Sequence, residues 1–177
     1  NKTIRCSLPP IVDLKANSQG GTIRLTSPAQ YTLSWTSTNA DTCSASGNWS
    51  GSKSQTGSLN YSGITVGTFT YTLTCSNPIG SASDSVTVIV YNPPVVDLKV
   101  NNQDGPITIV SPASFTLSWV SKDATSCTAT STDGIWAGNV VVAGSRSLNG
   151  AVTGTHTYTI TCSNQYESAS DSVTVIV

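Results

Sequence analysis

The sequence contains few of the residues that carry charge or catalysis. Only 10% of its 177 residues are charged, the net charge is -1, and it has one histidine (His156), one glutamate (Glu167) and no methionine. With no basic stripe to neutralise phosphates, nucleic acid is not predicted as a partner. No apolar run reaches the roughly 18 residues of a membrane helix, so no membrane insertion is predicted. Without a G-x-S-x-G sequence or paired acids, we predict no catalytic residue and no enzyme activity.

Five cysteines are present, and they point to an oxidising compartment. Four of them, Cys43, Cys75, Cys127 and Cys162, occupy equivalent places in two halves of the chain, whereas Cys6 stands apart. In a small Ser/Thr-rich chain this pattern is typical of a disulfide framework, so we predict an extracellular or cell-surface location. Zinc sites need closely spaced pairs such as C-x-x-C, and these cysteines are tens of residues apart. We therefore expect no metal and no cofactor.

An internal repeat sets the domain organisation. Its copies are PPIVDLKANSQGG from Pro9 and PPVVDLKVNNQDG from Pro93, YTLSWTS from Tyr31 and FTLSWVS from Phe115, and SASDSVTVIV from both Ser81 and Ser168. The offset between copies is 84 residues up to Cys127 and 87 residues from Trp136 onward. Three residues are therefore inserted within TATSTDGIW, which we expect to be a surface loop because loops tolerate insertion best.

Each repeat has the period-two pattern of β-strands. In FTYTLTC the apolar residues alternate with threonines, and in DSVTVIV the valines alternate with Ser, Thr and Ile. Glycine, proline and asparagine clusters punctuate about seven such segments per repeat, among them one near SKSQT. The pattern predicts an all-β chain of two antiparallel β-sandwiches, with an arm at 1–8, a first domain at 9–91 and a second at 92–177.

The repeats resemble the tandem immunoglobulin-like domains of bacterial cell-surface and secreted proteins. The motifs behind this resemblance are W-x(7)-C at Trp35 and Trp119, Y-T-[LI]-T-C at Tyr71 and Tyr158, and S-A-S-D-S-V-T-V. The order along each repeat is Trp, Cys, Cys, whereas antibody domains have Cys, Trp, Cys. The resemblance implies that tryptophan takes the place of the first cysteine and that the disulfide joins the next strand to the Tyr/Cys strand.

On this resemblance, the disulfides join Cys43 to Cys75 and Cys127 to Cys162. Closing loops of 32 and 35 residues stabilises each small domain by roughly 3.5 to 4 kcal/mol in the chain-entropy picture. That is a large share of the 5 to 15 kcal/mol typical of a domain. Nothing flanking these cysteines indicates a lowered thiol pKa, so we interpret them as structural rather than redox-active.

Two loop tryptophans and three sequons are candidate contact or modification sites. Trp49 and Trp136 lie beside glycines, where an aromatic ring could stack on a sugar; alternatively, each ring covers the end of its own core. Asn1, Asn48 and Asn60 head N-x-[ST] sequences and are candidate N-glycosylation acceptors. Surface glycans are thus predicted either as ligands or as attachments.

Two other polar positions have structural interpretations. His156 takes the place of Phe69 in the repeat, and we interpret it as a strand residue in a semi-buried aromatic position. Some surface domains of this class carry a Lys-to-Asn crosslink between first and last strands. Lys15 and Lys99 are placed for one, but the last strands contain no asparagine, so aspartates would have to serve.

The first residues repeat a strand motif outside either domain. TIRCS resembles the segments TLTCS and TITCS of the two Tyr/Cys strands, and Ile4, Cys6 and Leu8 alternate with polar residues. The arm has two interpretations. It is a remnant of a longer array, since Asn1 shows neither an initiator methionine nor a signal-peptide pattern. Alternatively, it is a strand that adds to a neighbouring subunit, with Cys6 free for an intermolecular bond. We therefore predict intersubunit contact through these three residues.

These observations predict a non-enzymatic structural protein. The leading hypothesis is a subunit of an extracellular fibre, pilus-like filament or cell-surface stalk that joins copies of itself head to tail through its arm. The Pro-Pro linker before each repeat favours extended chain and so supports a semi-rigid arrangement. The alternatives are an adhesin or carbohydrate-binding module that uses the loop tryptophans, or accessory domains of a larger secreted protein.

Overall fold

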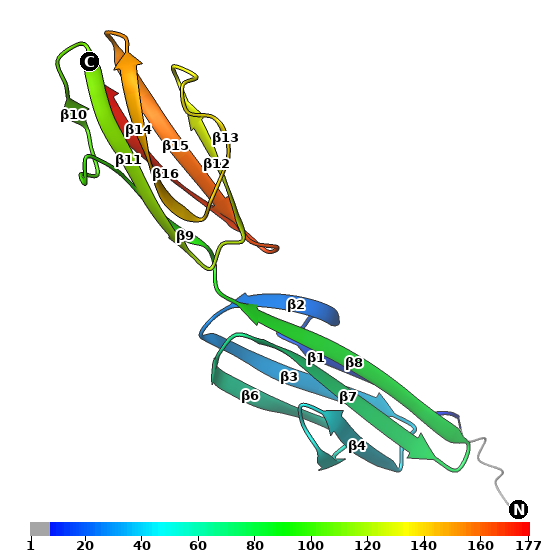
Figure 1. Cartoon of the computed structure of the whole chain (residues 1–177). Helices are drawn as coiled ribbons and strands as arrows, with labels where there is room; N and C mark the ends of the chain where they lie inside the picture. The colour runs from blue at the N-terminus through cyan, green and yellow to red at the C-terminus, as the bar shows by residue number, and fades with distance from the viewer. Residues whose placement is uncertain (1–7) are drawn as a thin grey trace, which may run out of the picture. The chain divides into compact units, whose positions relative to one another are not determined.

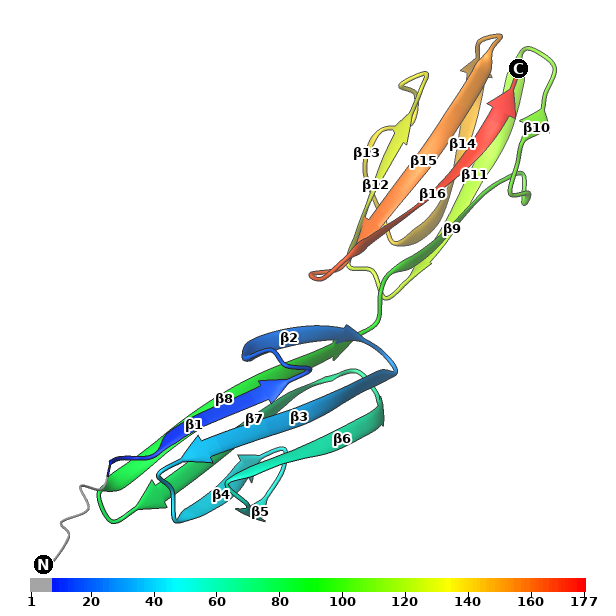
Figure 2. The same cartoon turned by 180° about the vertical axis from the view of Figure 1, so that it is seen from behind.

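The computed structural model describes residues 8–177, which form two units that divide between Asn92 and Pro93. Figures 1 and 2 show them from opposite sides, and each unit is described by itself. The division lies one residue after the boundary at 91 that the sequence predicted. Ile4 and Cys6 of the predicted arm, and the sequon residue Asn1, lie outside the described residues.

The first unit is a sandwich of a three-stranded and a five-stranded sheet. Its strands are β1 (Ile11–Ala16), β2 (Gly21–Thr26), β3 (Ala29–Thr38), β4 (Thr42–Gly47), β5 (Gly51–Lys53), β6 (Thr56–Ile64), β7 (Gly67–Asn77) and β8 (Gly80–Tyr91). The smaller sheet has the order β1-β3-β6, and the larger has the order β2-β8-β7-β4-β5. All of these pairs are antiparallel except β2 with β8, which is parallel.

The second unit repeats this plan. Its strands are β9 (Val95–Val100), β10 (Ile107–Thr108), β11 (Ala113–Lys122), β12 (Ser126–Ser131), β13 (Gly138–Val140), β14 (Ala143–Ala151), β15 (Thr155–Ser163) and β16 (Ser168–Ile176). The sheet orders are β14-β11-β9 and β10-β16-β15-β12-β13. The parallel pair is much shorter here, because β10 and β16 share two register pairs whereas β2 and β8 share six.

The described part of each repeat therefore has eight strands, where the sequence predicted about seven. The segment near SKSQT provides both β5 and the beginning of β6. β6 was missed because it is an edge strand whose side chains are mostly exposed, so its sequence TGSLNYSGI has no clear apolar alternation.

Alternation along the central strands builds each core. On β7 the side chains of Tyr71, Leu73 and Cys75 are buried, while the threonines between them are partly exposed. On β8, Val86 and Val88 face the same core. Because one face of each sheet is buried and the other is wet, the alternating pattern predicted the inward residues correctly.

Each disulfide joins two neighbouring strands of the larger sheet. Cys43 on β4 is the register partner of Cys75 on β7, with their Cα atoms 4.0 Å apart. Cys127 on β12 and Cys162 on β15 are related in the same way, at 4.1 Å. Both predicted pairings are confirmed. The bonds lie within one sheet, and the tryptophan of the preceding strand packs in the core.

A carboxylate on the last strand caps the first strand of each unit. Asp84 on β8 accepts hydrogen bonds from the backbone N–H of Leu14, at 2.7 Å, and of Ser85, at 2.8 Å. Asp171 on β16 accepts the equivalent bonds from Leu98, at 2.6 Å, and from the residue that follows it, at 2.8 Å. Since β1 and β9 are edge strands of the smaller sheets, each carboxylate ties that sheet to the larger one.

The lysine crosslink considered from the sequence, and not favoured there, does not match this arrangement. Lys15 pairs with Asp13 on its own strand, and Lys99 pairs with Asp97 and Asp104. The aspartate that would have served is instead engaged by backbone N–H groups.

Removing the capping carboxylate should destabilise the domain that contains it. We expect Asp84→Ala to cost about 2 kcal/mol, because it leaves the N–H of Leu14 without a charged acceptor, and Asp84→Asn to cost less. Chemical denaturation followed by amide signals of the first domain measures this. The control Asp13→Ala removes an exposed partner of Lys15 and should cost less than about 0.5 kcal/mol. Equal losses for Asp84→Ala and Asp13→Ala would contradict the capping role.

Candidate functional site

The two loop tryptophans are core residues. The side chain of Trp49 is 7% exposed and that of Trp136 is fully buried. Trp49 packs edge-on against Trp35, and Trp136 lies beside Trp119, with ring centroids 5.2 and 5.4 Å apart. Of the two interpretations that the sequence left open, contact of these rings with a ligand does not match the structure, because a buried ring offers no face for a sugar. The alternative, in which each ring covers its own core, describes the structure.

The predicted three-residue insertion lies in the loop between β12 and β13. That loop covers 132–137, whereas the loop between β4 and β5 covers only 48–50. The insertion changes the environment of the tryptophan that follows it. The indole N–H of Trp49 donates to the carbonyl of Thr72 at 3.0 Å, but the buried indole N–H of Trp136 has no hydrogen-bond partner.

In the first domain, the buried hydroxyls of two core tyrosines form a hydrogen bond with each other. The hydroxyls of Tyr31 and Tyr71 share a short hydrogen bond, and the ring of Tyr61 stacks on that of Tyr31 with centroids 5.0 Å apart. Burial, followed by the hydrogen bond to Tyr31, raises the pKa of the Tyr71 phenol far above its ordinary value. Both hydroxyls therefore stay protonated and neutral.

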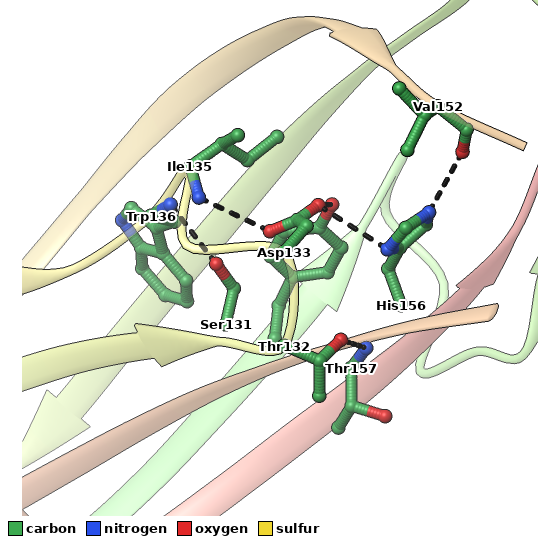
Figure 3. Close-up of polar contacts among 9 residues, drawn as sticks. Ser131, Thr132, Asp133, Ile135, Trp136, Val152, His156 and Thr157 are labelled. Atoms are coloured by element: carbon green, nitrogen blue, oxygen red, sulfur yellow. Dashed lines mark hydrogen bonds and ion pairs between the residues drawn. The ribbon is translucent and has the colours of Figure 1, made fainter. Parts of the chain in front are cut away.

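In the second domain, an aspartate replaces that tyrosine pair. Asp133, from the inserted loop, accepts a short hydrogen bond from the hydroxyl of Tyr158 on β15. The Nδ1 atom of His156 lies 3.6 Å from the same carboxylate oxygen, and Nε2–H donates to the carbonyl of Val152 at 2.8 Å. Figure 3 shows the carboxylate pointing from the loop toward the histidine ring, with Val152 on its far side. We call Asp133, His156 and Tyr158 the acidic cluster.

Three coordinated changes between the repeats account for the acidic cluster. Phe115 stands where the first domain has Tyr31, so the hydroxyl of Tyr158 has lost its former partner. The insertion supplies Asp133 in its place, and His156 replaces Phe69 next to the new charge. We predicted a semi-buried aromatic position for His156 from the sequence but missed the aspartate. The signal was available, since all three changes occur together in one of two otherwise similar repeats.

The carboxylate in the acidic cluster is held in its charged form. Burial alone would raise the pKa of Asp133, but hydrogen bonds outweigh it and lower the pKa below its ordinary value of 3.8. The donors are the hydroxyls of Tyr158 and Ser131 and the backbone N–H of Ile135, and the His156 ring adds a smaller attraction. Burial and the bond to Asp133 raise the pKa of the Tyr158 phenol in turn. A charged carboxylate between neutral donors is a strong anchor.

The geometry of the acidic cluster is that of a structural anchor. Both ring nitrogens of His156 face acceptor oxygens, and the side chains of His156 and Asp133 are only 10% and 8% exposed. Because both ring nitrogens face acceptor oxygens, neither is placed as the base of a nucleophile-base pair within the described residues. Among residues 8–177, no three His, Cys, Asp or Glu side chains gather as metal ligands.

The remaining predicted sites lie at the surface. The side chain of Asn48 is exposed, and its Oδ1 accepts the N–H of Thr70 at 2.7 Å. Asn60 is exposed on β6, and its Oδ1 accepts the hydroxyl of Thr32 at 2.7 Å. Leu8, the one arm residue inside the described range, is 59% exposed. Intersubunit contact and glycosylation at these positions stay predictions. Within the same residues, no helix is long and apolar enough to cross a membrane.

The orphaned indole of the second domain should make its tryptophan easier to replace. Trp49→Phe removes the donor to the Thr72 carbonyl, whereas Trp136→Phe removes a buried N–H that has no acceptor. We expect Trp49→Phe to cost about 1 to 2 kcal/mol more than Trp136→Phe, measured by denaturation of each domain. Equal costs would show that the hydrogen bond of Trp49 contributes nothing to stability.

The acidic cluster should give the second domain an acid-labile share of its stability. Because the pKa of Asp133 is lower in the folded state than its ordinary 3.8, its contribution is present above that value and is lost as the pH falls through the folded pKa. The stability difference between wild type and Asp133→Asn should therefore be constant near neutral pH and shrink below about pH 4. Denaturation across pH checks this, with exposed Asp104→Asn as the control. If the stability difference does not change with pH, the lowered pKa of Asp133 in the folded state is contradicted.

Comparisons with known proteins place the fold. No protein-family model and no curated protein sequence matches the chain. Among solved structures, it is similar to extracellular domains 3–5 of Drosophila OTK, with 13% identity and a TM-score of 0.62 over 93% of this chain and 62% of that one. It is also similar to an E-to-A variant of titin domains I67–I69, with 15% identity and a TM-score of 0.53 over 95% and 65%.

The chain thus spans less than two thirds of the length of either neighbour. Likeness at these identities shows the fold alone. Together with two sandwiches of matching strand order and one disulfide in each, it confirms the predicted fold class. The chain consists of two consecutive immunoglobulin-like β-sandwich domains.

Proposed function

We propose that the chain is a non-enzymatic structural segment of an extracellular or cell-surface protein, a stalk or fibre subunit that bears tension between its ends. The observation that carries this proposal is the parallel pairing of β2 with the last strand β8. Six consecutive register pairs join them, from Gly21 with Val86 to Thr26 with Tyr91.

Parallel pairing at this place resists pulling. Within the first domain, β1 begins at one end and β8 leaves at the other (Figure 1). Tension therefore pulls β2 toward the start of the domain and β8 toward its end. Since the two strands run in the same direction, their hydrogen bonds are loaded in shear and must fail together. An antiparallel hairpin pulled from its open end would instead separate one bond at a time.

The disulfide adds a covalent limit to extension. Cys43 and Cys75 are 32 positions apart in the sequence, and the chain between them cannot lengthen while the bond is intact. At about 3.5 Å per residue, this withholds about 110 Å of chain from extension. Disulfides persist in oxidising surroundings, which supports an extracellular location. The acidic cluster adds no catalytic function, because its ring nitrogens and carboxylate are all engaged.

End-to-end assembly through the arm is the finer part of the proposal. Leu8 is exposed, and its carbonyl accepts the side-chain amide of Asn77 at 2.7 Å, so the chain enters the domain beside the turn between β7 and β8. We propose that the residues before Leu8 contact a neighbouring subunit from this place. Two further parts of the proposal are also predictions from the sequence: a relationship to bacterial surface proteins, and contact with surface glycans.

Single-molecule stretching of the full chain tests the load-bearing role. The first domain, with six parallel register pairs, should unfold at higher force than the second, which has two. The variant Cys43→Ala with Cys75→Ala labels the first domain, because its unfolding event then lengthens by about 110 Å. The matched variant Cys127→Ala with Cys162→Ala lengthens the other event.

The order of the two events decides the outcome. If the labelled first domain yields at the same force as the second, or before it, the parallel pair does not set mechanical resistance. The load-bearing proposal would then lose the observation on which it rests.

A further inference from the structure

The outer face of the larger sheet carries hydroxyls on its three central strands, next to the exposed Arg24 on the edge strand β2. On β4 and β7, and on β8 as far as Thr87, every outward position is serine or threonine, and the remaining alternate positions of β8 are Ile89 and Tyr91. There are three such positions on β4, five on β7 and four on β8, twelve in all: Thr42, Ser44, Ser46, Thr68, Thr70, Thr72, Thr74, Ser76, Ser81, Ser83, Ser85 and Thr87. We call these twelve residues the hydroxyl face of the first domain, and their twelve counterparts the hydroxyl face of the second domain.

The second domain repeats the hydroxyl face position by position. Its twelve residues on β12, β15 and β16 are Ser126, Thr128, Thr130, Thr155, Thr157, Thr159, Thr161, Ser163, Ser168, Ser170, Ser172 and Thr174. None of the positions has become charged, apolar or amide in either copy. The two copies have meanwhile diverged elsewhere, including the loop insertion and the acidic cluster.

The fold itself does not require this uniformity. The outer face of the smaller sheet is mixed, with Asp13 and Lys15 on β1 and with Val120 and Lys122 on β11. Strand propensity favours threonine but not serine, and solvated strands ordinarily carry lysine and glutamate as well. Charges on a sheet surface also keep copies of a protein apart. The larger sheet lacks that protection on its central strands.

Hydrogen bonds between neighbouring strands fix many of these hydroxyls. Thr74 bonds to Ser83 at 2.8 Å, and the equivalent Thr161 bonds to Ser170 at 2.8 Å. Thr70 and Thr87 are joined at 3.1 Å. Because each hydroxyl has one donor and two acceptor sites, such bonds leave capacity for a further partner while holding the side chain in place. A preorganised surface loses less entropy when it binds.

We propose that the hydroxyl face docks on the hydroxyl face of a second copy of this chain. A hydroxyl both donates and accepts, so an array of hydroxyls is complementary to itself, whereas an array of like charges repels its copy. Small side chains also let two sheets approach and interdigitate. This inference rests on the proposed structural role, to which it adds side-by-side association of segments.

Other occupants fit the surface less well. A small ligand or a glycan needs a concave site with apolar or aromatic lining, and the twelve positions of each domain hold no aromatic ring. Trp35, Trp49, Trp119 and Trp136 are all buried in the cores. Nucleic acid needs a basic surface, which twelve uncharged side chains cannot provide. The twelve positions carry no charge, which suits a second uncharged set of the same kind.

The area of the hydroxyl face determines how strongly two such faces should associate. With strands about 4.8 Å apart and alternate residues about 6.7 Å apart, twelve positions cover about 400 Å². A stable interface buries about 800 Å² on each partner, so one pair of faces should associate weakly and reversibly. Repetition of the face along joined segments would raise the effective concentration and strengthen the contact.

Sedimentation of the full chain tests the proposal, with Cys6→Ser to prevent disulfide exchange and an intact mass to show that no sugar is attached. We expect reversible self-association over a micromolar-to-millimolar series. Thr72→Lys with Thr159→Lys places a charge at the centre of each face and should weaken it at least tenfold. The control, Ser34→Lys with Ser118→Lys, puts equal charge on the outer face of the smaller sheet and should leave association unchanged.

A charge exchange makes the test specific. Mixing the Thr72/Thr159 lysine variant with the equivalent glutamate variant should restore association, because opposite charges then meet across the contact. A version without residues 1–7 should associate equally, which separates this contact from assembly through the arm. A wild-type chain that stays monomeric, or two lysine variants that behave alike, would overturn the proposal. Neither result bears on resistance to stretching.

Discussion

The pairing of two neighbouring strands by a disulfide is the constraint on which each domain depends. Because Cys43 and Cys75 are register partners, the bond permits only one alignment of β4 with β7. A slip by one residue would turn every side chain of a strand to the opposite face. The same bond therefore directs Tyr71 and Leu73 into the core and places the threonines between them on the outer surface. Core and surface are two consequences of one register.

Comparison of the two repeats shows how one plan accommodates local change. The first domain closes the end of its core with neutral tyrosines, and the second closes it with the acidic cluster. The replacement required an inserted loop, the loss of a hydroxyl at Phe115 and a histidine beside the new carboxylate. The indole N–H of Trp136 has no acceptor in the second domain, and a buried donor without a partner lowers the stability of that domain. The disulfide and the capping aspartate are the same in both.

The sequence predicted what depends on periodicity and repetition, and missed what depends on contacts across space. Two sandwiches and the inward faces of β7 and β8 follow from alternation, and the resemblance to tandem immunoglobulin-like domains implied both disulfides. The edge strand β6 has no apolar alternation to reveal it. Asp84 meets the N–H of a residue 70 positions away, which no local pattern encodes. For the loop tryptophans the sequence left ligand contact and core packing both open, because glycine neighbours indicate a turn but not the direction of a ring.

Each disulfide fixes the strand register of its own domain. Four tryptophans report on it, since Trp35 and Trp49 lie in the first core and Trp119 and Trp136 in the second. Thermal unfolding of the variant Cys127→Ala with Cys162→Ala, followed by the four indole signals, measures both cores in one molecule. The account predicts that Trp119 and Trp136 lose their native signals at a much lower temperature, as expected for a loss of about 4 kcal/mol, while the other two hold near their wild-type midpoint. Equal shifts of all four signals, or none, would contradict it.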